Sequence, residues 1–360
     1  MKTINKYQYQ LKAAKSVFNM MLSKRFIASV LAAAPGSGKS TILIHILNDF
    51  FSKYPHKKAV ILTHNQNILK NQMIDNFENP HVSVGFSFGL IGSDKQVEIG
   101  IPANSSKIER IDLLVVDEAH QYYWESMTDS IVEKFNPEYQ ILMTGSPSYF
   151  IRYNKAVNNS NRNIKKFGMY FIAANDLVDL GVFSPIDLDV VRFNGDSISD
   201  KIIATMRHAK QHRYNMDKIM WACKNIKEAK SVAYYLKNIF KKQVFMSTSQ
   251  NDSDNQQIEE FKKSEKGILI VVNKGILGFS DNSITALVDF KCSKNLDTRN
   301  QLFARGLRRH EKGIRKTYLS VSNSINWNKE GQIIHQIVSL MERDVFMNYD
   351  GKTIKEVYIK

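Results

Sequence analysis

The chain has 360 residues, 43% of them hydrophobic and 24% charged, and a formal net charge of +15. This composition excludes a disordered or fibrous protein, and the length is more than one hydrophobic core usually serves, so we expect two domains. The positive excess favours a polyanionic partner, nucleic acid above all, over an anionic membrane surface or a charge spread over the protein for solubility.

The sequence gives no indication of secretion or membrane insertion. The N-terminal segment MKTINKYQYQLK is polar throughout, and the apolar run at residues 26–35 is too short to span a bilayer. Cys223 and Cys292 form neither a metal-ligand spacing nor a disulfide framework. We therefore expect an intracellular, cytoplasmic protein in a reducing compartment, without membrane association.

In chain order, the first half alternates apolar runs with helical patterns. The segment FIASVLAAAPGSGKSTILIHILNDFF predicts a strand, a glycine-rich turn and a helix, and KKAVILTHNQNILKNQMIDNF repeats the strand and the helix. IDLLVVDEAH and YQILMTGSP add two more short strands, each closed by a polar loop. Apolar runs of this length between helices predict strands buried on both faces of a parallel sheet.

The second half repeats this alternation. KIMWACKNIKEAKSVAYYLKNIF predicts a strand followed by a helix, and KQVFMSTSQ, GILIVVNKG, ITALVDFKC and RKTYLSVSN predict further strands. Two such halves predict an α/β protein of two similar domains, with a ligand site in the cleft between them. The polar segment RYNKAVNNSNRN predicts the joint, so that domain 1 covers residues 1–153 and domain 2 covers residues 154–360.

The segment AAPGSGKST, residues 33–41, fits a phosphate-binding loop with Ala33 in the first small position. Glycines let backbone N–H groups surround phosphate oxygens, Lys39 reaches the β- and γ-phosphates, and the Ser40 hydroxyl binds Mg²⁺. The alternative is a glycine-rich turn that binds nothing. We expect ATP and Mg²⁺ as cofactors, with nucleotide contacts from Gly36, Ser37, Gly38, Lys39, Ser40 and Thr41.

Two adjacent acids follow the apolar run LLVV. Asp117 is placed to hold the Mg²⁺ ion of the phosphate loop through its water shell, and Glu118 to activate the water that attacks the γ-phosphate. The alternative is an acidic pair that only stabilises the N-terminus of a helix.

With both motifs in place, the sequence resembles the superfamily 2 helicases and translocases, in which DEAH is the second motif. The resemblance implies two tandem RecA-like P-loop NTPase domains with ATP in the cleft between them. YQYQLKAA, LTHNQNILKNQ and MTGSP resemble other motifs of the first domain in the family order. The roles that the resemblance implies are adenine recognition by Gln10, nucleic-acid binding by Thr63, His64 and Asn65, and coupling by His120, Thr144 and Ser146.

The second half carries three further motifs of that family, the first of them MWACKNIKEA. QLFARGLRR resembles the final motif, in which Gln301 and the arginine fingers Arg305 and Arg308 face the γ-phosphate; alone, the segment would read as a solvated basic helix face. VVNKGILGFSDNSI resembles the motif that contacts both ribose and nucleic acid, which implies a nucleic-acid contact for Lys274. The ribose-binding carboxylate of this motif stands one position late here, at Asp281.

These motifs predict an ATP hydrolase that acts as a nucleic-acid helicase or translocase. The segments SPSYFIRYNKAV, YFIAANDLVDLGVFSPIDLDVV and VDFKCSKNLDTRNQLFARGLRR resemble the restriction-subunit, phage UvsW and RadD branch. This narrower resemblance favours DNA over RNA, a monomer, and a partner such as a nuclease or a replication or repair component. Residues 281–301 leave no room for a strand-separating hairpin, so a double-strand translocase or annealing motor is an alternative. An RNA helicase, a non-hydrolysing nucleic-acid adaptor and an unrelated phosphate-loop kinase are the others. Trp221 and Phe279 could stack on bases, but we expect core packing.

Overall fold

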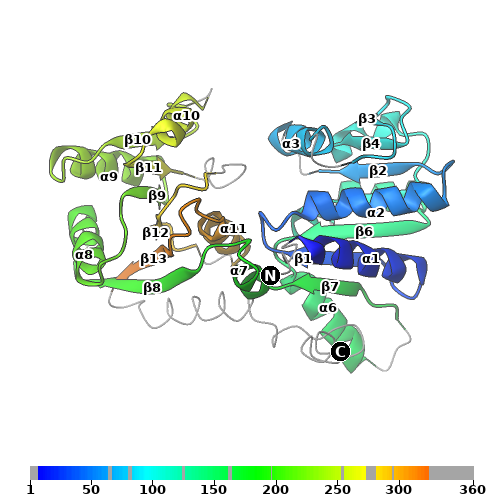
Figure 1. The fold of residues 1–360 in the computed structure, drawn as a ribbon, viewed down its shortest axis with the longest axis horizontal. Helices are drawn as coiled ribbons and strands as arrows, with labels where there is room; N and C mark the ends of the chain where they lie inside the picture. Colours follow the sequence, from blue (N-terminus) through cyan, green and yellow to red (C-terminus); the bar gives the residue numbers. More distant parts are fainter. Residues whose placement is uncertain are drawn as a thin grey trace, which may run out of the picture. The chain divides into compact units, whose positions relative to one another are not determined.

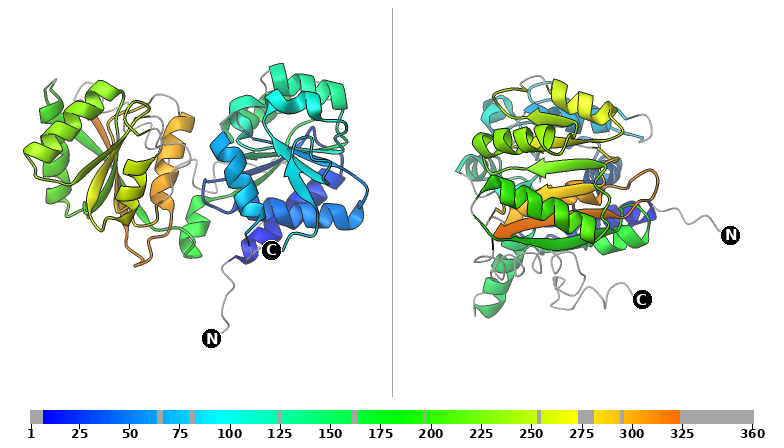
Figure 2. Two further views of the ribbon diagram at one scale, coloured as in Figure 1. Left: turned by 90° about the horizontal axis from the view of Figure 1, so that it is seen from above. Right: turned by 90° about the vertical axis from the view of Figure 1, so that its left-hand side faces the viewer.

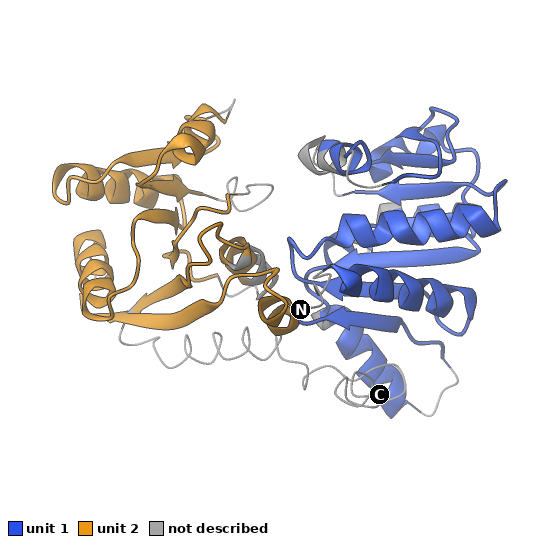
Figure 3. Cartoon of the chain, viewed as in Figure 1, with its two compact units in different colours: residues 1–173, 343–360 blue, residues 174–342 orange. Residues whose placement is uncertain are grey.

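The computed structural model describes residues 7–63, 67–79, 83–123, 126–160, 164–195, 197–252, 255–272, 281–293 and 296–323. The chain divides after Ala173 into two compact units (Figure 3). Each unit contains one sheet with helices on both of its faces (Figures 1 and 2).

Unit 1 is built on a seven-stranded sheet of order β3-β4-β2-β5-β6-β1-β7, in which every pair of neighbours is parallel. Its strands are β1 (Ser29–Ala33), β2 (Ala59–Leu62), β3 (Phe88–Leu90), β4 (Val97–Gly100), β5 (Leu113–Val116), β6 (Tyr139–Thr144) and β7 (Gly168–Ile172). Its helices are α1 (Gln8–Leu22), α2 (Lys39–Lys53), α3 (Asn67–Phe77), the 3₁₀ helix η1 (Pro102–Lys107), α4 (Ala119–Tyr122), α5 (Ser126–Phe135) and α6 (Ser148–Asn159).

The central strands of unit 1 have the burial that their sequences predict. All four residues of β2 and of β5 are buried, because helices cover the sheet on both sides. α2 packs an apolar face that includes Ile42, Ile46 and Phe50 into this core. Since all the strands run in the same direction, the loops that follow β1, β2, β5 and β6 all start from one edge of the sheet.

Unit 2 is built on a six-stranded parallel sheet of order β10-β11-β9-β12-β13-β8. Its strands are β8 (Ile186–Phe193), β9 (Lys218–Ala222), β10 (Val244–Ser247), β11 (Gly267–Val271), β12 (Ala286–Asp289) and β13 (Lys316–Asn323). Its helices are α7 (Ala174–Asp179), α8 (Ile198–Gln211), α9 (Ile226–Asn238), α10 (Gln256–Lys263) and α11 (Leu296–Leu307).

Local signals in the sequence explain two helix starts in unit 2. Ser197 and Asn225 are the N-cap residues of α8 and α9, and their side-chain oxygens accept hydrogen bonds from the backbone N–H groups of Asp200 and Glu228.

Trp221 is fully buried in β9 and packs edge-on against the Phe290 ring, with the ring centroids 4.9 Å apart. The expectation that Trp221 packs in a core is confirmed; Phe279 lies outside the described residues.

The boundary between the units differs from the predicted one between residues 153 and 154. Residues 152–159 of the polar segment that suggested a joint lie in α6. Asn154 connects this helix to the chain before β7, because its side chain hydrogen-bonds both the N–H and the carbonyl oxygen of Phe167, each at 2.9 Å. β7 then pairs with β1, so residues up to Ala173 belong to unit 1. Side-chain polarity alone did not distinguish this exposed helix from a linker.

Two further expectations concern the membrane and the thiols. No helix among the described residues is long and apolar enough to cross a membrane. Cys223 and Cys292 are both free thiols, and burial raises the pKa of the Cys223 thiol well above its usual range.

Candidate active site

The loop between β1 and α2 has the conformation that phosphate binding requires. Gly36 and Gly38 have φ angles of 86° and 82°, in the left-handed region that glycine adopts without strain. α2 begins at Lys39, so the N–H groups in the first turn of a 15-residue helix face the loop. The Lys39 ammonium donates a hydrogen bond to the Ala33 carbonyl oxygen at 3.1 Å, which holds it over the loop. Backbone amides and one cation are thus available for phosphate oxygens.

The start of α1 packs directly on this loop. The Tyr9 hydroxyl donates a hydrogen bond to the Ser37 carbonyl oxygen at 2.6 Å, and Gln10 Nε2 donates to the Tyr9 hydroxyl at 3.4 Å. A Cβ atom at Gly38 would lie only 2.3 Å from Gln10 Nε2. The predicted adenine-reading Gln10 therefore lies against the phosphate loop. Tyr9 was not predicted, although it forms the Tyr-Gln pair with Gln10.

The two adjacent acids lie at the carboxyl end of β5. The Asp117 N–H bonds to the Leu62 carbonyl oxygen of the neighbouring strand β2, which fixes Asp117 at the sheet edge. Burial and the Glu118 carboxylate raise the pKa of Asp117 to about 7, although the Lys39 ammonium lowers it. This environment lacks enough positive charge for two ionised acids, so a cation would stabilise them.

Glu118 has two features that are unusual for a carboxylate of purely structural use. Its φ angle is 50°, in the left-handed region that is unfavourable for a residue with a Cβ. Its Oε2 atom is buried and accepts no hydrogen bond from the described residues, and it lies 3.5 Å from His120 Nδ1. A strained backbone and an unsatisfied buried acceptor are typical of functional sites.

The residues available for a metal ion fit Mg²⁺. This ion prefers oxygen ligands, and the Asp117 carboxylate and the Ser40 hydroxyl supply oxygen atoms. Asn76 Nδ2 donates a hydrogen bond to Ser40 Oγ at 3.3 Å and orients that hydroxyl. Asn76 was not predicted, because it lies on α3 and no motif marks it. Thr41 follows Ser40 in the first turn of α2 and is partly buried.

The three predicted coupling residues meet at the carboxyl end of β6. Thr144 is fully buried, and its hydroxyl lies 2.9 Å from His120 Nδ1 and accepts a hydrogen bond from the Ser146 N–H at 2.9 Å. The Ser146 hydroxyl is buried and makes no hydrogen bond within the described part of the chain. Because His120 also lies beside Glu118, these contacts connect the acid pair to the loop after β6.

The predicted nucleic-acid loop after β2 is only partly described. Thr63 is fully buried, and its hydroxyl lies 3.4 Å from the carbonyl oxygen of Gly100. Its side chain is therefore buried in this structure, and a nucleic-acid contact by Thr63 stays a prediction. A residue next to a fully buried strand continues the core rather than starting the loop. His64 and Asn65 lie outside the described residues, as does Lys274 in unit 2.

The predicted arginine fingers lie at the end of α11 in unit 2. Arg305 is in the last turn of this helix and Arg308 follows the helix, where it forms an antiparallel bridge with Phe183. Both side chains are partly buried, and burial lowers the pKa of Arg308. Gln301 lies in the same helix, but its side chain is outside the described part of the structure. Arg305 and Arg308, three residues apart, therefore lie at the end of a helix and not on a fully solvated helix face.

A buried arginine on α11 was missed by the sequence reasoning. Arg299 is 1% exposed, and its Nε atom donates a hydrogen bond to the Ser293 carbonyl oxygen at 2.6 Å. The same atom lies 4.0 Å from Asp289 Oδ2, which also accepts a hydrogen bond from the Tyr318 hydroxyl at 2.7 Å. This polar core connects α11 to the ends of β12 and β13, and so positions the helix that carries Arg305.

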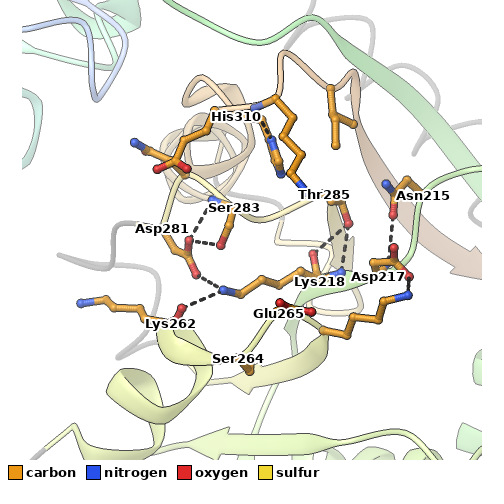
Figure 4. A pocket seen from close by; sticks show the side chains of 15 residues that line it. Asn215, Asp217, Lys218, Lys262, Ser264, Glu265, Asp281, Ser283, Thr285 and His310 are labelled. Carbon is orange, nitrogen blue, oxygen red and sulfur yellow. Dashed lines mark hydrogen bonds and ion pairs between the residues drawn. The ribbon is translucent and has the colours of Figure 1, made fainter.

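The displaced carboxylate of Asp281 has partners within unit 2 (Figure 4). Its Oδ1 atom accepts a hydrogen bond from the Ser283 N–H at 2.8 Å, and its Oδ2 atom lies 3.1 Å from the Lys218 ammonium. Lys218 also donates to the Lys262 carbonyl oxygen at 3.0 Å. These residues line a cavity of about 640 Å³. A ribose hydroxyl at Asp281 would have to compete with Lys218.

Comparisons with known proteins extend this description. Residues 3–149 match the family model described as the res subunit of type III restriction enzymes. No curated protein matches the sequence.

Two solved structures are similar in fold. A fragment described as an HsdR subunit of a type I restriction enzyme from Vibrio vulnificus YJ016 aligns with 89% of this chain at 16% identity and a TM-score of 0.66. This chain spans 64% of the length of that fragment. S. cerevisiae Dbp5, bound to RNA and ADP BeF3, aligns with 93% of this chain and 92% of its own length, at 14% identity and a TM-score of 0.58.

The match of residues 3–149, less than half of the chain, to the restriction-subunit family model agrees with the resemblance drawn from the motifs of the first unit. The predicted fold class, two units with mainly parallel sheets flanked by helices, is confirmed. The two solved structures share this fold with the chain.

Proposed function

We propose that this protein is an ATP-dependent nucleic-acid helicase or translocase that acts on branched or duplex DNA in preference to RNA. One observation carries the proposal. A single edge of the unit 1 sheet combines the glycine-rich loop with Lys39 after β1, the Asp117–Glu118 pair after β5, and Thr144 at the end of β6. A protein that only binds ATP would have no use for a strained, unsatisfied carboxylate at Glu118.

Each residue has a separate role in the proposed hydrolysis. Lys39 and the N–H groups of the loop bind the β- and γ-phosphates, and Gln10 recognises the adenine. Ser40 and Asp117 hold Mg²⁺, which when bound neutralises charge on the phosphates. Glu118 orients the attacking water and accepts its proton. The residues contribute mainly by positioning groups and stabilising charge, as is usual in phosphoryl transfer.

Unit 2 contributes the remaining groups in this proposal. Arg305 and Arg308 contact the γ-phosphate in the transition state, with Gln301 beside them, and Asp281 contacts the ribose. His120, Thr144 and Ser146 transmit the state of the γ-phosphate to the nucleic-acid contacts, for which Thr63, His64, Asn65 and Lys274 remain the candidates. The net charge of +15 supports a polyanionic track.

The experiment that tests the proposal is ATP hydrolysis measured with single-stranded, duplex and branched DNA and with RNA, at one salt concentration. Glu118→Gln should bind a fluorescent ATP analogue normally and lower kcat by about 10²–10⁴-fold, the range for loss of a general base. Glu109→Gln, at an exposed carboxylate of the same unit, is the matched control and should retain full activity. Near-normal turnover by Glu118→Gln would remove Glu118 from the water-activating role.

Variants of unit 2 test the arginine fingers separately. Arg305→Ala should lower kcat by about 10³-fold or more with little change in nucleotide affinity. A merely two-fold loss would remove Arg305 from the arginine-finger role. Strand displacement on forked and blunt duplexes then distinguishes a helicase from a double-strand translocase or annealing motor, and stimulation by RNA alone would favour an RNA helicase.

A further inference from the structure

The C-terminal end of α8 carries two histidines on one face. His208 and His212 are four residues apart, so the helix brings their side chains together, and their ring centroids are 4.3 Å apart. His208 is partly buried and His212 is exposed. Both lie where the negative end of the helix dipole favours a cation.

A carboxylate of the edge strand β8 faces these rings. Asp189 Oδ2 lies 2.6 Å from His208 Nε2 and accepts a hydrogen bond from the Tyr214 hydroxyl at 3.1 Å, while Oδ1 accepts one from the Val190 N–H at 2.8 Å. One carboxylate oxygen of Asp189 is thus directed toward the histidines.

The end of the helix is built so that Tyr214 orients this group. The Tyr214 N–H bonds to the Ala209 carbonyl oxygen at 3.0 Å and the Arg213 N–H to that of Lys210 at 3.2 Å, which is a Schellman motif. The motif places the Tyr214 ring nearly parallel to the His212 ring, with centroids 5.5 Å apart. The tyrosine thus supports both the exposed histidine and the carboxylate oxygen.

The three side chains have the composition and the spacing of a metal site. One ligand atom from each of Asp189, His208 and His212 can be chosen so that all lie within 4.8 Å of one another, the one such group among the described residues. Metal–ligand bonds of about 2.0–2.2 Å in a tetrahedron put neighbouring ligand atoms roughly 3.3 Å apart. The Asp189 Oδ2–His208 Nε2 distance of 2.6 Å is shorter than this, by about 0.7 Å, and the ligand atoms of all three residues lie within 4.8 Å of one another.

We propose that Asp189, His208 and His212 bind a divalent transition-metal ion of the Zn²⁺, Co²⁺ or Ni²⁺ class, with water in the remaining position. Two imidazoles and one carboxylate select these ions over Mg²⁺ and Ca²⁺, which prefer ligand sets made only of oxygen. The ion ties the end of α8 to β8, which is the outermost strand of the unit 2 sheet. Without an ion, the same residues would form only a hydrogen-bonded Asp–His pair between helix and strand.

The test is metal binding by the full-length protein, purified without a polyhistidine tag, treated with a chelator and free of nucleotide. Calorimetric titration with ZnCl₂ should show one site that Mg²⁺ does not occupy, and Co²⁺ should give the visible absorption of a tetrahedral nitrogen and oxygen site. Zn²⁺ should also raise the melting temperature.

Variants locate the site and separate it from other histidines. His212→Ala changes an exposed side chain and should weaken Zn²⁺ binding by about 100-fold or more, whereas Tyr214→Phe removes only a supporting hydroxyl and should weaken it by about tenfold. His56→Ala, at an exposed histidine of unit 1, should bind as the wild type does. If wild type and His212→Ala bind Zn²⁺ equally, or if neither binds it, the proposal is wrong. ATP hydrolysis is not part of the readout, so this result is independent of the proposed function.

Discussion

Replacing Gly38 by alanine tests whether the packing of α1 on the phosphate loop requires a residue without a Cβ atom at position 38. The new Cβ would lie 2.3 Å from Gln10 Nε2, at a residue whose φ angle is +82°. The Gln10 amide is the end of a flexible side chain, so it can move away. It would then lose its 3.4 Å hydrogen bond to the Tyr9 hydroxyl.

The expected magnitude follows from these two costs. A left-handed backbone is unfavourable for an L-residue by about 1–2 kcal/mol. A lost hydrogen bond costs about 0.5–1.5 kcal/mol, and a bond of 3.4 Å belongs at the low end of that range. Gly38→Ala should therefore lower the stability of unit 1 by about 1.5–2.5 kcal/mol. It should also weaken nucleotide binding, because Gln10 leaves its place beside the loop.

Gly92→Ala is the matched control in the same unit. Gly92 has a φ angle of +88°, but its Cβ would meet only the Lys107 side chain, at an ordinary 3.5 Å. Urea unfolding followed by circular dichroism should show the backbone cost alone for Gly92→Ala, with unchanged affinity for a fluorescent ATP analogue. In a Gln10→Ala background the two glycine variants should become equally destabilising. Equal stability and equal affinity of the two single variants would refute the reasoning.

Three further changes probe the interior. Arg299→Met leaves the buried Asp289 carboxylate without its cation, so urea unfolding of unit 2 should show a loss of about 3–5 kcal/mol, much of it recovered when Asp289 is also made apolar. Burial lowers the pKa of Lys316 from 10.5 to about 8, so between pH 8 and pH 10.5 the unfolded state binds more protons than the folded state. The stability of the wild type relative to Lys316→Met should therefore rise over this pH range. A stability difference that does not change with pH would contradict the lowered pKa. Thr144→Val removes the oxygen that contacts His120 and should cost about 1–3 kcal/mol in the same assay, whereas Thr144→Ser should cost less.

The elements that were predictable are those with a short-range signal. The apolar runs of β2 and β5, the glycines before Lys39 and the acid pair after β5 are all local patterns, and a parallel sheet necessarily brings the ends of such strands to one edge. His120 and Thr144 lie close together for the same reason, because one follows β5 and the other ends the neighbouring strand β6.

The features that were missed depend on residues far apart in the sequence. Tyr9 acts on a carbonyl oxygen 28 positions later, and Asn76 reaches Ser40 from another helix. Lys218 neutralises Asp281 only because β9 begins beside the segment that precedes β12. None of these contacts has a periodicity or a motif that could be read before the chain is folded.

The same distinction explains the unit boundary. The segment before β7 is polar because α6 is exposed on one side, and Asn154 hydrogen-bonds this helix to Phe167, just before β7. The amino-acid composition of a segment indicates how exposed it is to solvent. Linkers and surface helices are both exposed, so composition alone does not distinguish them.

The backbone conformation of Glu118 affects stability and catalytic activity in opposite directions. A φ angle of 50° suits glycine better than glutamate, so Glu118→Gly should relax the turn after β5. The variant should resist denaturation at least as well as the wild type and should lack the ATP hydrolysis that we propose. The wild-type chain has an unfavourable backbone conformation at Glu118. With glutamate at this position, a buried carboxylate oxygen has no hydrogen-bond partner among the described residues and can accept a proton from a reactant.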